Sequence, residues 1–195
     1  MRYEKGRKDA SRRRIMQVAA ERFRSDGIAA SGLAGIMSDA GLTNGAFYPH
    51  FRSKAELVRE CVAETLEAQA SRLQERLAEG GLEQVIAAYL SPQHRDNAAK
   101  GCTAAALLPE LSREPSKARR LYAKRLLDTV RRLASALPPQ TEDREGVALG
   151  FYATLIGTLQ LARATKGTAL SDRILTAGAE AARALVRGAQ DGKPS

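Results

Sequence analysis

Apolar residues recur at helical spacing along most of this chain. From Ser11 to Asp26 the apolar positions share one helical face: Ile15, Val18, Ala19 and Phe23. Gly27 follows, and a glycine is suited to end a helix because it accepts a positive φ. Strict alternation of apolar and polar residues, typical of half-buried strands, does not occur. We therefore predict an all-α fold with about nine helices.

The same spacing predicts the remaining helices, with glycines and prolines marking their ends. They are Leu33–Ala40, Asn44–His50, a long helix opened by a capping box at Ser53–Glu56 and ended by Gly80-Gly81, Leu82–Leu90, Cys102–Ser112, Ser116–Leu137, Glu142–Thr165 and Ser171–Arg187. Residues 1–10 show no apolar period, so we expect a loose basic arm there. Residues 92–100 are expected to form a polar loop.

Positive charge is concentrated near the N-terminus of the 195-residue chain. Residues 1–55 hold 11 Lys/Arg and 5 Asp/Glu, a balance of +6, whereas residues 56–195 hold 20 and 17, a balance of +3. A focused positive field attracts a polyanion such as nucleic acid. A solubilising tail is the alternative, and charge alone does not separate the two.

Other bulk features narrow the class of protein. The apolar runs are too short for a transmembrane helix, and the N-terminus lacks the apolar core of a secretory signal. We therefore expect a cytoplasmic protein whose two cysteines, Cys61 and Cys102, are reduced thiols. The length fits two domains, which we place at residues 1–57 and 58–195.

Two short predicted helices joined at Gly41-Leu42-Thr43 form a helix-turn-helix over about residues 33–52. The run LTNGAFYPHF, residues 42–51, crowds aromatic residues into a chain that is only 5% aromatic. We expect Phe47 and Phe51 to anchor the second helix from inside, with Leu42 filling the angle between the helices. The alternative interpretation is a purely structural one, a small core under a surface turn. It holds for these three residues.

The polar and small residues of this motif predict contacts with DNA. Thr43, at the helix N-terminus, is placed to hold a phosphate, and Tyr48, His50 and Lys54 can reach the same backbone. A second group is small enough to approach base edges in the major groove: Asn44, Gly45 and Ala46. We also assign Ser31, just before the first short helix, to the DNA-binding surface.

The run AAERFRSDGIAASGLAGIMSDAGLTNGAFYPHFRSKAELV resembles the DNA-binding domain of TetR-family transcriptional regulators. This resemblance covers about a quarter of the chain. It implies a homodimer on a palindromic operator in double-stranded DNA, a C-terminal domain that binds a small-molecule effector, and no cofactor. Gly32 and Gly35 depart from the pattern, because a glycine inside a helix costs up to about 1 kcal/mol. Pro49 limits the length of the second helix.

Small residues in the last two predicted helices suit a dimer interface with two helices from each subunit. The candidates are Gly146, Gly150, Gly157, Ala177, Ala181 and Ala184. The alternative is that both helices pack only within their own subunit.

The segment KGCTAAALLPELSREP resembles a stretch found in a subset of TetR-family sensor domains. Pro109 can bend its helix and open space for an apolar effector pocket. The candidate lining residues are Cys102, Leu107, Leu108, Leu111, Tyr122, Leu126, Phe151, Tyr152 and Leu155. The alternative for each is simple core filling.

Two regulatory hypotheses follow, and an enzyme is disfavoured. The first is a repressor released from DNA by a small hydrophobic effector. The second is a thiol-based sensor of electrophiles or oxidants acting through Cys102, which precedes a helix N-terminus near Lys100. The chain has only His50 and His94, no metal-ligand cluster, no nucleotide-binding loop and no nucleophile elbow. We expect His94 to be solvated. A nonspecific, nucleoid-like DNA binder is a further alternative.

Overall fold

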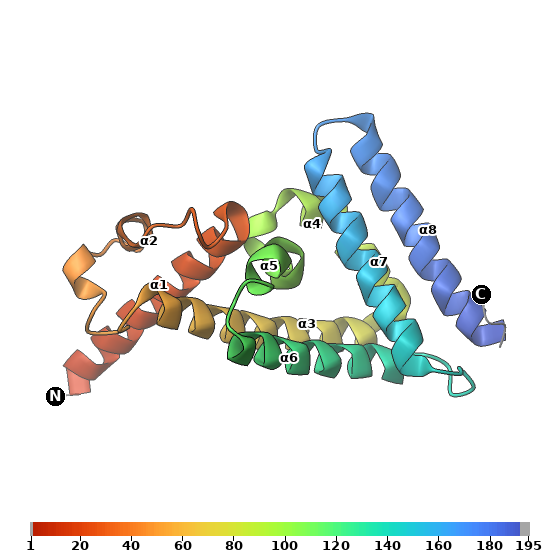
Figure 1. The fold of residues 1–195 in the computed structure, drawn as a ribbon, viewed down its shortest axis with the longest axis horizontal. Helices are drawn as coiled ribbons and strands as arrows, with labels where there is room; N and C mark the ends of the chain where they lie inside the picture. Colours follow the sequence, from red (N-terminus) through yellow and green to blue (C-terminus); the bar gives the residue numbers. More distant parts are fainter. Residues whose placement is uncertain (1, 192–195) are drawn as a thin grey trace. The chain divides into compact units, whose positions relative to one another are not determined.

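The computed structural model describes residues 2–191, and most of them are helical (Figure 1). In chain order the elements are α1 (Arg2–Asp26), α2 (Leu33–Asp39), the 3₁₀ turn η1 (Asn44–Ala46), α3 (Lys54–Tyr89), α4 (Pro92–Asp96), the 3₁₀ turn η2 (Ala98–Lys100), α5 (Thr103–Leu111), α6 (Ser116–Ser135), α7 (Arg144–Ala164) and α8 (Ala169–Asp191). No strand occurs between residues 2 and 191. The predicted all-α fold is confirmed.

The chain forms two compact units, and each unit is made of two separate segments of the chain. Unit 1 comprises residues 2–67 and Ala98–Glu114, and unit 2 comprises Ala68–Asn97 and residues 115–191. The segment Ala98–Glu114, which we placed in the C-terminal domain, is therefore grouped with the N-terminal elements. The chain leaves unit 2 after Asn97 and returns to it at Pro115.

Unit 1 is built around α1. This helix contacts α2, η2 and α5, and α2 contacts η1. The side chains that are most completely buried in unit 1 are Ile15, Phe23, Ile36, Met37, Phe47, Phe51, Leu57 and Leu107. Phe47 and Phe51 are each 1% exposed, so both aromatic anchors lie in the core as predicted.

The N-terminal helix is longer than its apolar pattern indicates. We expected a loose arm over residues 1–10, but α1 begins at Arg2. Residues 2–10 are mostly good helix formers with no proline, and extending an existing helix costs far less than nucleating one. The single glycine, Gly6, costs about 1 kcal/mol and does not stop the helix. Only Met1 of the expected arm lies outside the described residues.

The second helix of the helix-turn-helix is shorter than predicted. Instead of a helix over Asn44–His50, the chain forms η1 over Asn44–Ala46 and then turns through His50. Pro49 has no N–H to donate and disfavours helical geometry at Tyr48, and Gly45 is a poor helix former. Gly41 makes the preceding turn with φ +71°, which the sequence predicted correctly.

Helix α3 begins and breaks where the sequence indicates. The Oγ of Ser53 accepts a hydrogen bond from the N–H of Glu56 (3.2 Å), and the Glu56 carboxylate accepts one from the N–H of Arg52 (2.6 Å). This pair is the expected capping box, except that Glu56 bonds to the N–H of Arg52 and not to that of Ser53. At Gly80-Gly81 the backbone leaves helical geometry, with φ +62° at Gly81, so Leu82 starts a second helical stretch.

In unit 2, α7 contacts α4, α6 and α8, and Figure 1 shows α7 and α8 side by side. The crossing of α7 and α8 is very close at Gly178. A Cβ there would lie 2.2 Å from Cγ2 of Thr158, so only glycine fits without displacement. By length and composition alone α7 could span a membrane, which we had not expected of any segment. Its buried side chains, including Phe151 and Leu155, are those of a core helix.

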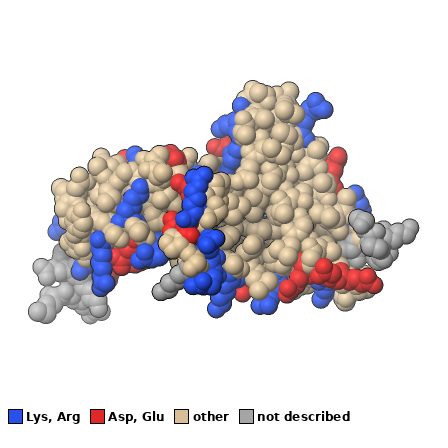
Figure 2. Space-filling model, in the orientation of Figure 1, with Lys and Arg blue, Asp and Glu red and all other residues tan. Residues whose placement is uncertain are grey.

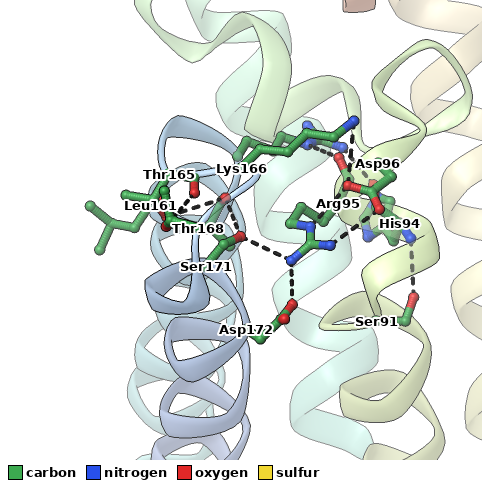
Figure 3. A network of polar contacts seen from close by, with 12 residues as sticks. Ser91, His94, Arg95, Asp96, Leu161, Thr165, Lys166, Thr168, Ser171 and Asp172 are labelled. Carbon is green, nitrogen blue, oxygen red and sulfur yellow. Dashed lines mark hydrogen bonds and ion pairs between the residues drawn. The ribbon is translucent and has the colours of Figure 1, made fainter.

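The predicted polar loop at residues 92–100 contains α4 and η2. Ser91 caps α4 by accepting the N–H of His94 (3.1 Å), and Pro92 follows at the first helical position. Arg95 then donates through Nη1 to Ser171 Oγ (2.9 Å) and to Asp172 (2.6 Å) on α8. Figure 3 shows this polar network, which fastens α4 to the start of α8.

His94 is half-buried, so the expectation of a solvated side chain was wrong. Its Nδ1 lies 2.7 Å from the carbonyl oxygen of Tyr89, and the two rings meet edge to face at 4.7 Å. Burial lowers the pKa of His94 below 6.5, and Arg163 and Arg76 lower it further against the opposing contact with the Tyr89 carbonyl. The neutral form is therefore favoured near pH 7.

Candidate nucleic-acid interface

The outer side of the helix-turn-helix carries polar side chains above a buried aromatic layer. Tyr48 is 69% exposed, and its ring meets the buried ring of Phe47 edge to face at 5.5 Å. Thr43 and Asn44 are also exposed. The side chains of Thr43, Asn44 and Tyr48 make no hydrogen bond to the part of the chain that the structure describes. These groups are free to bind an external partner.

Thr43 stands at the N-cap position of η1, as predicted, but its side chain makes no capping hydrogen bond. Gly45 is exposed, and a Cβ added to it would meet nothing within 4 Å. Ala46 is half-buried. We expect Asn44, Gly45 and Ala46 to face base edges, and their side chains are all small.

His50 lies beside this surface and is half-buried. Its Nδ1 is buried and has no hydrogen-bond partner among the described residues. Burial lowers the pKa of His50 below 6.5, and the nearby Lys8 and Arg12 lower it further, against a smaller raising effect of Asp9. The ring is consequently neutral near pH 7, and an adjacent phosphate would favour its protonated form.

Two of the predicted contact residues have partners inside the protein. Lys54 donates through Nζ to the carbonyl oxygen of Ile28 (2.6 Å), which leaves two of its three N–H donors available. Ser31 differs from the other candidates because it is 0% exposed. Its hydroxyl donates to the carbonyl of Gly27 (2.6 Å), so this side chain stabilises the turn between α1 and α2.

The positive charge of the N-terminal region reaches the surface of unit 1, as the blue side chains in Figure 2 show. Arg13 and Arg14 are exposed on α1. Arg12 instead forms an ion pair with Glu60 and lies over the ring of Phe51, with its Cζ 5.0 Å from the ring centroid. The exposed arginines thus supply the polyanion-attracting field, and Arg12 stabilises the aromatic layer.

One structural contact of the motif was not predicted, and it explains a glycine that appeared unfavourable. Arg22 on α1 donates through Nε to Asp39 on α2 (2.6 Å). Its guanidinium passes over Gly35, where an added Cβ would lie 2.6 Å from Nη1. No local sequence signal marks this pair, because the two charges are 17 residues apart.

A family model described as bacterial regulatory proteins of the tetR family matches residues 15–61, the stretch that contains the whole helix-turn-helix. Residues 15–61 therefore form a DNA-binding domain of the kind found in tetR-family regulators, with a helix-turn-helix. A comparison with curated proteins found no match.

Solved structures of tetR-family regulators share the fold across nearly the whole chain. A TetR-family transcriptional regulator from Cytophaga hutchinsonii has a TM-score of 0.75 at 19% identity, covering 94% of this chain and 96% of that chain. A TetR transcriptional regulator from Chloroflexus aurantiacus has a TM-score of 0.73 at 22% identity, covering 92% and 96%. The reduced form of E. coli NemR has a TM-score of 0.74 at 19% identity, covering 90% and 96%.

The residues predicted to line an effector pocket are divided between the two units. Cys102, Leu107, Leu108 and Leu111 belong to unit 1, whereas Tyr122, Leu126, Phe151, Tyr152 and Leu155 belong to unit 2. Within these groups Leu107, Phe151 and Leu155 are 1% exposed and fill the cores of their units. Leu108, Tyr122, Leu126 and Tyr152 are half-buried.

The small residues predicted for a dimer interface fall into two groups. Gly146 serves the start of α7, since its N–H donates to Asp143 (3.0 Å) and a Cβ would lie 2.0 Å from that carboxylate. Gly150 is exposed and Gly157 half-buried on α7, and the α8 alanines Ala177, Ala181 and Ala184 are exposed. Figure 2 shows that the middle of α7 presents a largely uncharged surface.

The two cysteines are both buried thiols. Burial raises the pKa of Cys61 to about 12, with Glu64 and Glu60 adding to the effect. Its thiol donates to the carbonyl of Met16 (3.4 Å), so Cys61 is an inert core residue. Cys102 stands at the N-cap position of α5 and its side chain makes no capping hydrogen bond.

Proposed function

We propose that this regulator is a cytoplasmic homodimeric repressor that binds a palindromic operator and releases it when a small hydrophobic effector binds. The observation that supports DNA binding is a set of polar side chains that make no hydrogen bond to the described residues, Thr43, Asn44 and Tyr48, held above buried Phe47 and Phe51. Two such sites related by a twofold axis would face half-sites about 34 Å apart.

The roles of the individual residues follow from their exposure and chemistry. Thr43, Tyr48, His50 and Lys54 contact phosphates and set the position of the protein on the duplex. Asn44, Gly45 and Ala46 face base edges in the major groove, where the side chain of Asn44 can read an adenine. Because Arg13, Arg14 and Lys54 displace counterions, affinity falls steeply as salt concentration rises.

The test of DNA recognition uses a duplex that the purified protein itself selects from a random library. The double variant Tyr48→Ala, Lys54→Ala should raise the Kd for this duplex by roughly 100-fold or more, since it removes one neutral and one charged hydrogen bond. Fluorescence anisotropy measures the Kd. The variant Tyr48→Phe, which lacks only the hydroxyl, should lose less affinity.

Because Lys54 also contacts Ile28, circular dichroism must show that the double variant is folded. An unchanged Kd in a folded double variant would refute the assignment of this surface. Equal affinity for the selected and random duplexes would instead identify a nonspecific DNA binder.

The exposed faces of α7 and α8 support a homodimer. Gly150 and Gly157 on one helix and Ala177, Ala181 and Ala184 on the other leave room for a second pair of helices to approach. Replacing Ala181 with Glu should weaken the dimer and leave the helical content unchanged. Sedimentation velocity measures the change, and an unaltered dimer would place the interface elsewhere.

We place the effector among the aromatic and aliphatic side chains of unit 2, namely Tyr122, Leu126, Phe151, Tyr152 and Leu155. Half-buried Tyr122 and Tyr152 combine an apolar ring with a polar group, which suits an aromatic or hydrophobic molecule. Native mass spectrometry of the purified protein would detect a copurified molecule. The variants Tyr122→Ala and Tyr152→Ala should reduce its retention.

The second candidate is a thiol-based sensor acting through Cys102. Cys102 stands at the N-cap position of α5, and the fold is shared with a protein solved as E. coli NemR in a reduced form. Cys102→Ser should abolish any loss of DNA binding caused by an electrophile such as N-ethylmaleimide, whereas Cys61→Ser should not. An identical response in Cys102→Ser would eliminate the thiol mechanism.

A further inference from the structure

The segment Ala98–Glu114 belongs to unit 1, although the chain enters it from unit 2 and returns to unit 2 after it. Two groups near its ends hold the C-terminal end of α1. The carbonyl oxygen of Ala99 accepts a hydrogen bond from Nε of Arg24 (2.6 Å). Glu110, on the last turn of α5, holds the turn that follows α1. These contacts join the segment to α1 and to the turn that precedes the helix-turn-helix.

The contact made by Glu110 is a carboxylate in a backbone turn that is shaped for an anion. Its Oε1 accepts hydrogen bonds from the N–H of Ile28 (2.9 Å) and of Ala29 (3.1 Å), and its Oε2 lies 3.1 Å from the Ile28 nitrogen. Gly27 orients these N–H groups with φ +87°, and an added Cβ would lie 3.4 Å from Oε1. Successive N–H groups converging on one carboxylate form a charge-assisted contact.

The same turn is held on its carbonyl side by residues of the DNA-binding motif. Lys54 donates to the carbonyl of Ile28 (2.6 Å), and Ser31 donates to the carbonyl of Gly27 (2.6 Å). The N–H of Ile28 thus donates to Glu110, and the carbonyl oxygen of Ile28 accepts from Lys54. Helix α2 begins five residues later, at Leu33.

We propose that Glu110 is a positioning residue that couples α5 to the helix-turn-helix through the turn at Gly27–Ala29. A shift of α5 changes the position of this turn, and with it both Lys54 and α2. The inference rests on the proposed function only where DNA is used as a probe. Glu110 itself contacts no DNA in this scheme and acts through Ile28 and Lys54.

The first test needs neither operator nor effector. In the full-length variant Glu110→Gln, the amide hydrogens of Ile28 and Ala29 should exchange roughly ten- to a hundredfold faster than in the parent, because a charged acceptor is lost. The amide of Leu42, which donates to the Met37 carbonyl within the helix-turn-helix (2.9 Å), should also exchange faster. Residue-resolved NMR measures these rates. The matched control is Glu114→Gln, a carboxylate in the same segment that should change none of them.

The second test uses the duplex selected by the parent protein. In the parent and in Glu114→Gln, binding this duplex should change amide exchange in α5, whereas in Glu110→Gln the duplex should still bind and α5 should not respond. Unchanged protection of Ile28, Ala29 and Leu42, or an undiminished response of α5, would overturn the proposal. If Glu110→Gln does not fold, the variant Glu110→Asp replaces it. This variant keeps the charge on a side chain that is shorter by one methylene, and the same amide exchange rates are measured. If the parent selects no duplex, the proposed function fails, and the exchange at Leu42 still decides the coupling.

Discussion

The two units use their polar side chains in opposite ways. In the helix-turn-helix of unit 1, Thr43, Asn44 and Tyr48 have no hydrogen-bond partner within the described chain. In unit 2, the polar residues where α4 meets α7 and α8 bond to one another, with Arg95 joined to Ser171 and Asp172 (Figure 3). The first arrangement leaves donors and acceptors for an external ligand. The second uses them to fasten helices, so polarity alone does not identify a binding surface.

The largest expected effect is a difference in stability between variants of the buried aromatic layer and variants of the exposed layer in the DNA-binding motif. Phe51→Ala should lower the free energy of unfolding by about 3–5 kcal/mol, because it empties a fully buried ring site beneath Arg12. Tyr48→Ala, which removes an equally large but 69% exposed ring, should change it by less than about 0.5 kcal/mol. Urea unfolding followed by circular dichroism measures both. Similar losses in the two variants would show that Tyr48 also supports the fold.

An intermediate effect is expected at the helix crossing of unit 2. Gly178→Ala should cost about 1–3 kcal/mol, because the new Cβ overlaps the side chain of Thr158. Adding Thr158→Ala should recover part of this loss, since it removes the two nearest atoms, Cγ2 and Oγ1, and leaves only Cβ at 2.7 Å. Thermal unfolding of the single and double variants forms a double-mutant cycle. If the two losses simply add, the two positions do not determine the distance between α7 and α8.

The smallest expected effect is a dependence on pH that differs between the two histidines. Both have a pKa below 6.5 in the folded protein, so the unfolded chain takes up protons first as pH falls and stability decreases below about pH 6.5. His94 should contribute up to about 1.4 kcal/mol per pH unit, and the more exposed His50 less because solvent screens it.

His94→Gln should therefore flatten the dependence of unfolding free energy on pH between 6.5 and 5 more than His50→Gln does. Urea unfolding at several pH values measures the slopes. DNA binding should reverse the preference at His50, since a phosphate favours the imidazolium. A larger effect of His50→Gln on the free protein would contradict the assigned burial of the two rings.

Features determined by neighbouring residues were predictable from the sequence. The capping box at Ser53 and Glu56, the turn at Gly41 and the break at Gly80-Gly81 each depend on a few adjacent residues, and each was found where expected. The motif at residues 42–51 carried enough of these signals to indicate its family.

Features determined by distant residues were not predictable. The contacts of Glu110 with Ile28 and of Arg95 with Asp172 join residues 82 and 77 positions apart, so no local pattern marks them. The extent of α1 was also missed, because an apolar period shows where a helix is docked and not where an exposed extension stops. At Pro49 the opposite error occurred, since a regular pattern was extended through a residue that ends it.

The excursion of Ala98–Glu114 into unit 1 has a consequence for protein engineering. A chimaeric regulator made by joining this chain's residues up to Glu67 to a foreign sensor domain would lack the carbonyl of Ala99 and the carboxylate of Glu110. In the transplanted head three N–H groups would lose these acceptors: Nε of Arg24 and the backbone N–H groups of Ile28 and Ala29. Transferring the segment Ala98–Glu114 together with the head would keep these acceptors, and the recipient would have to supply two splice sites for the segment.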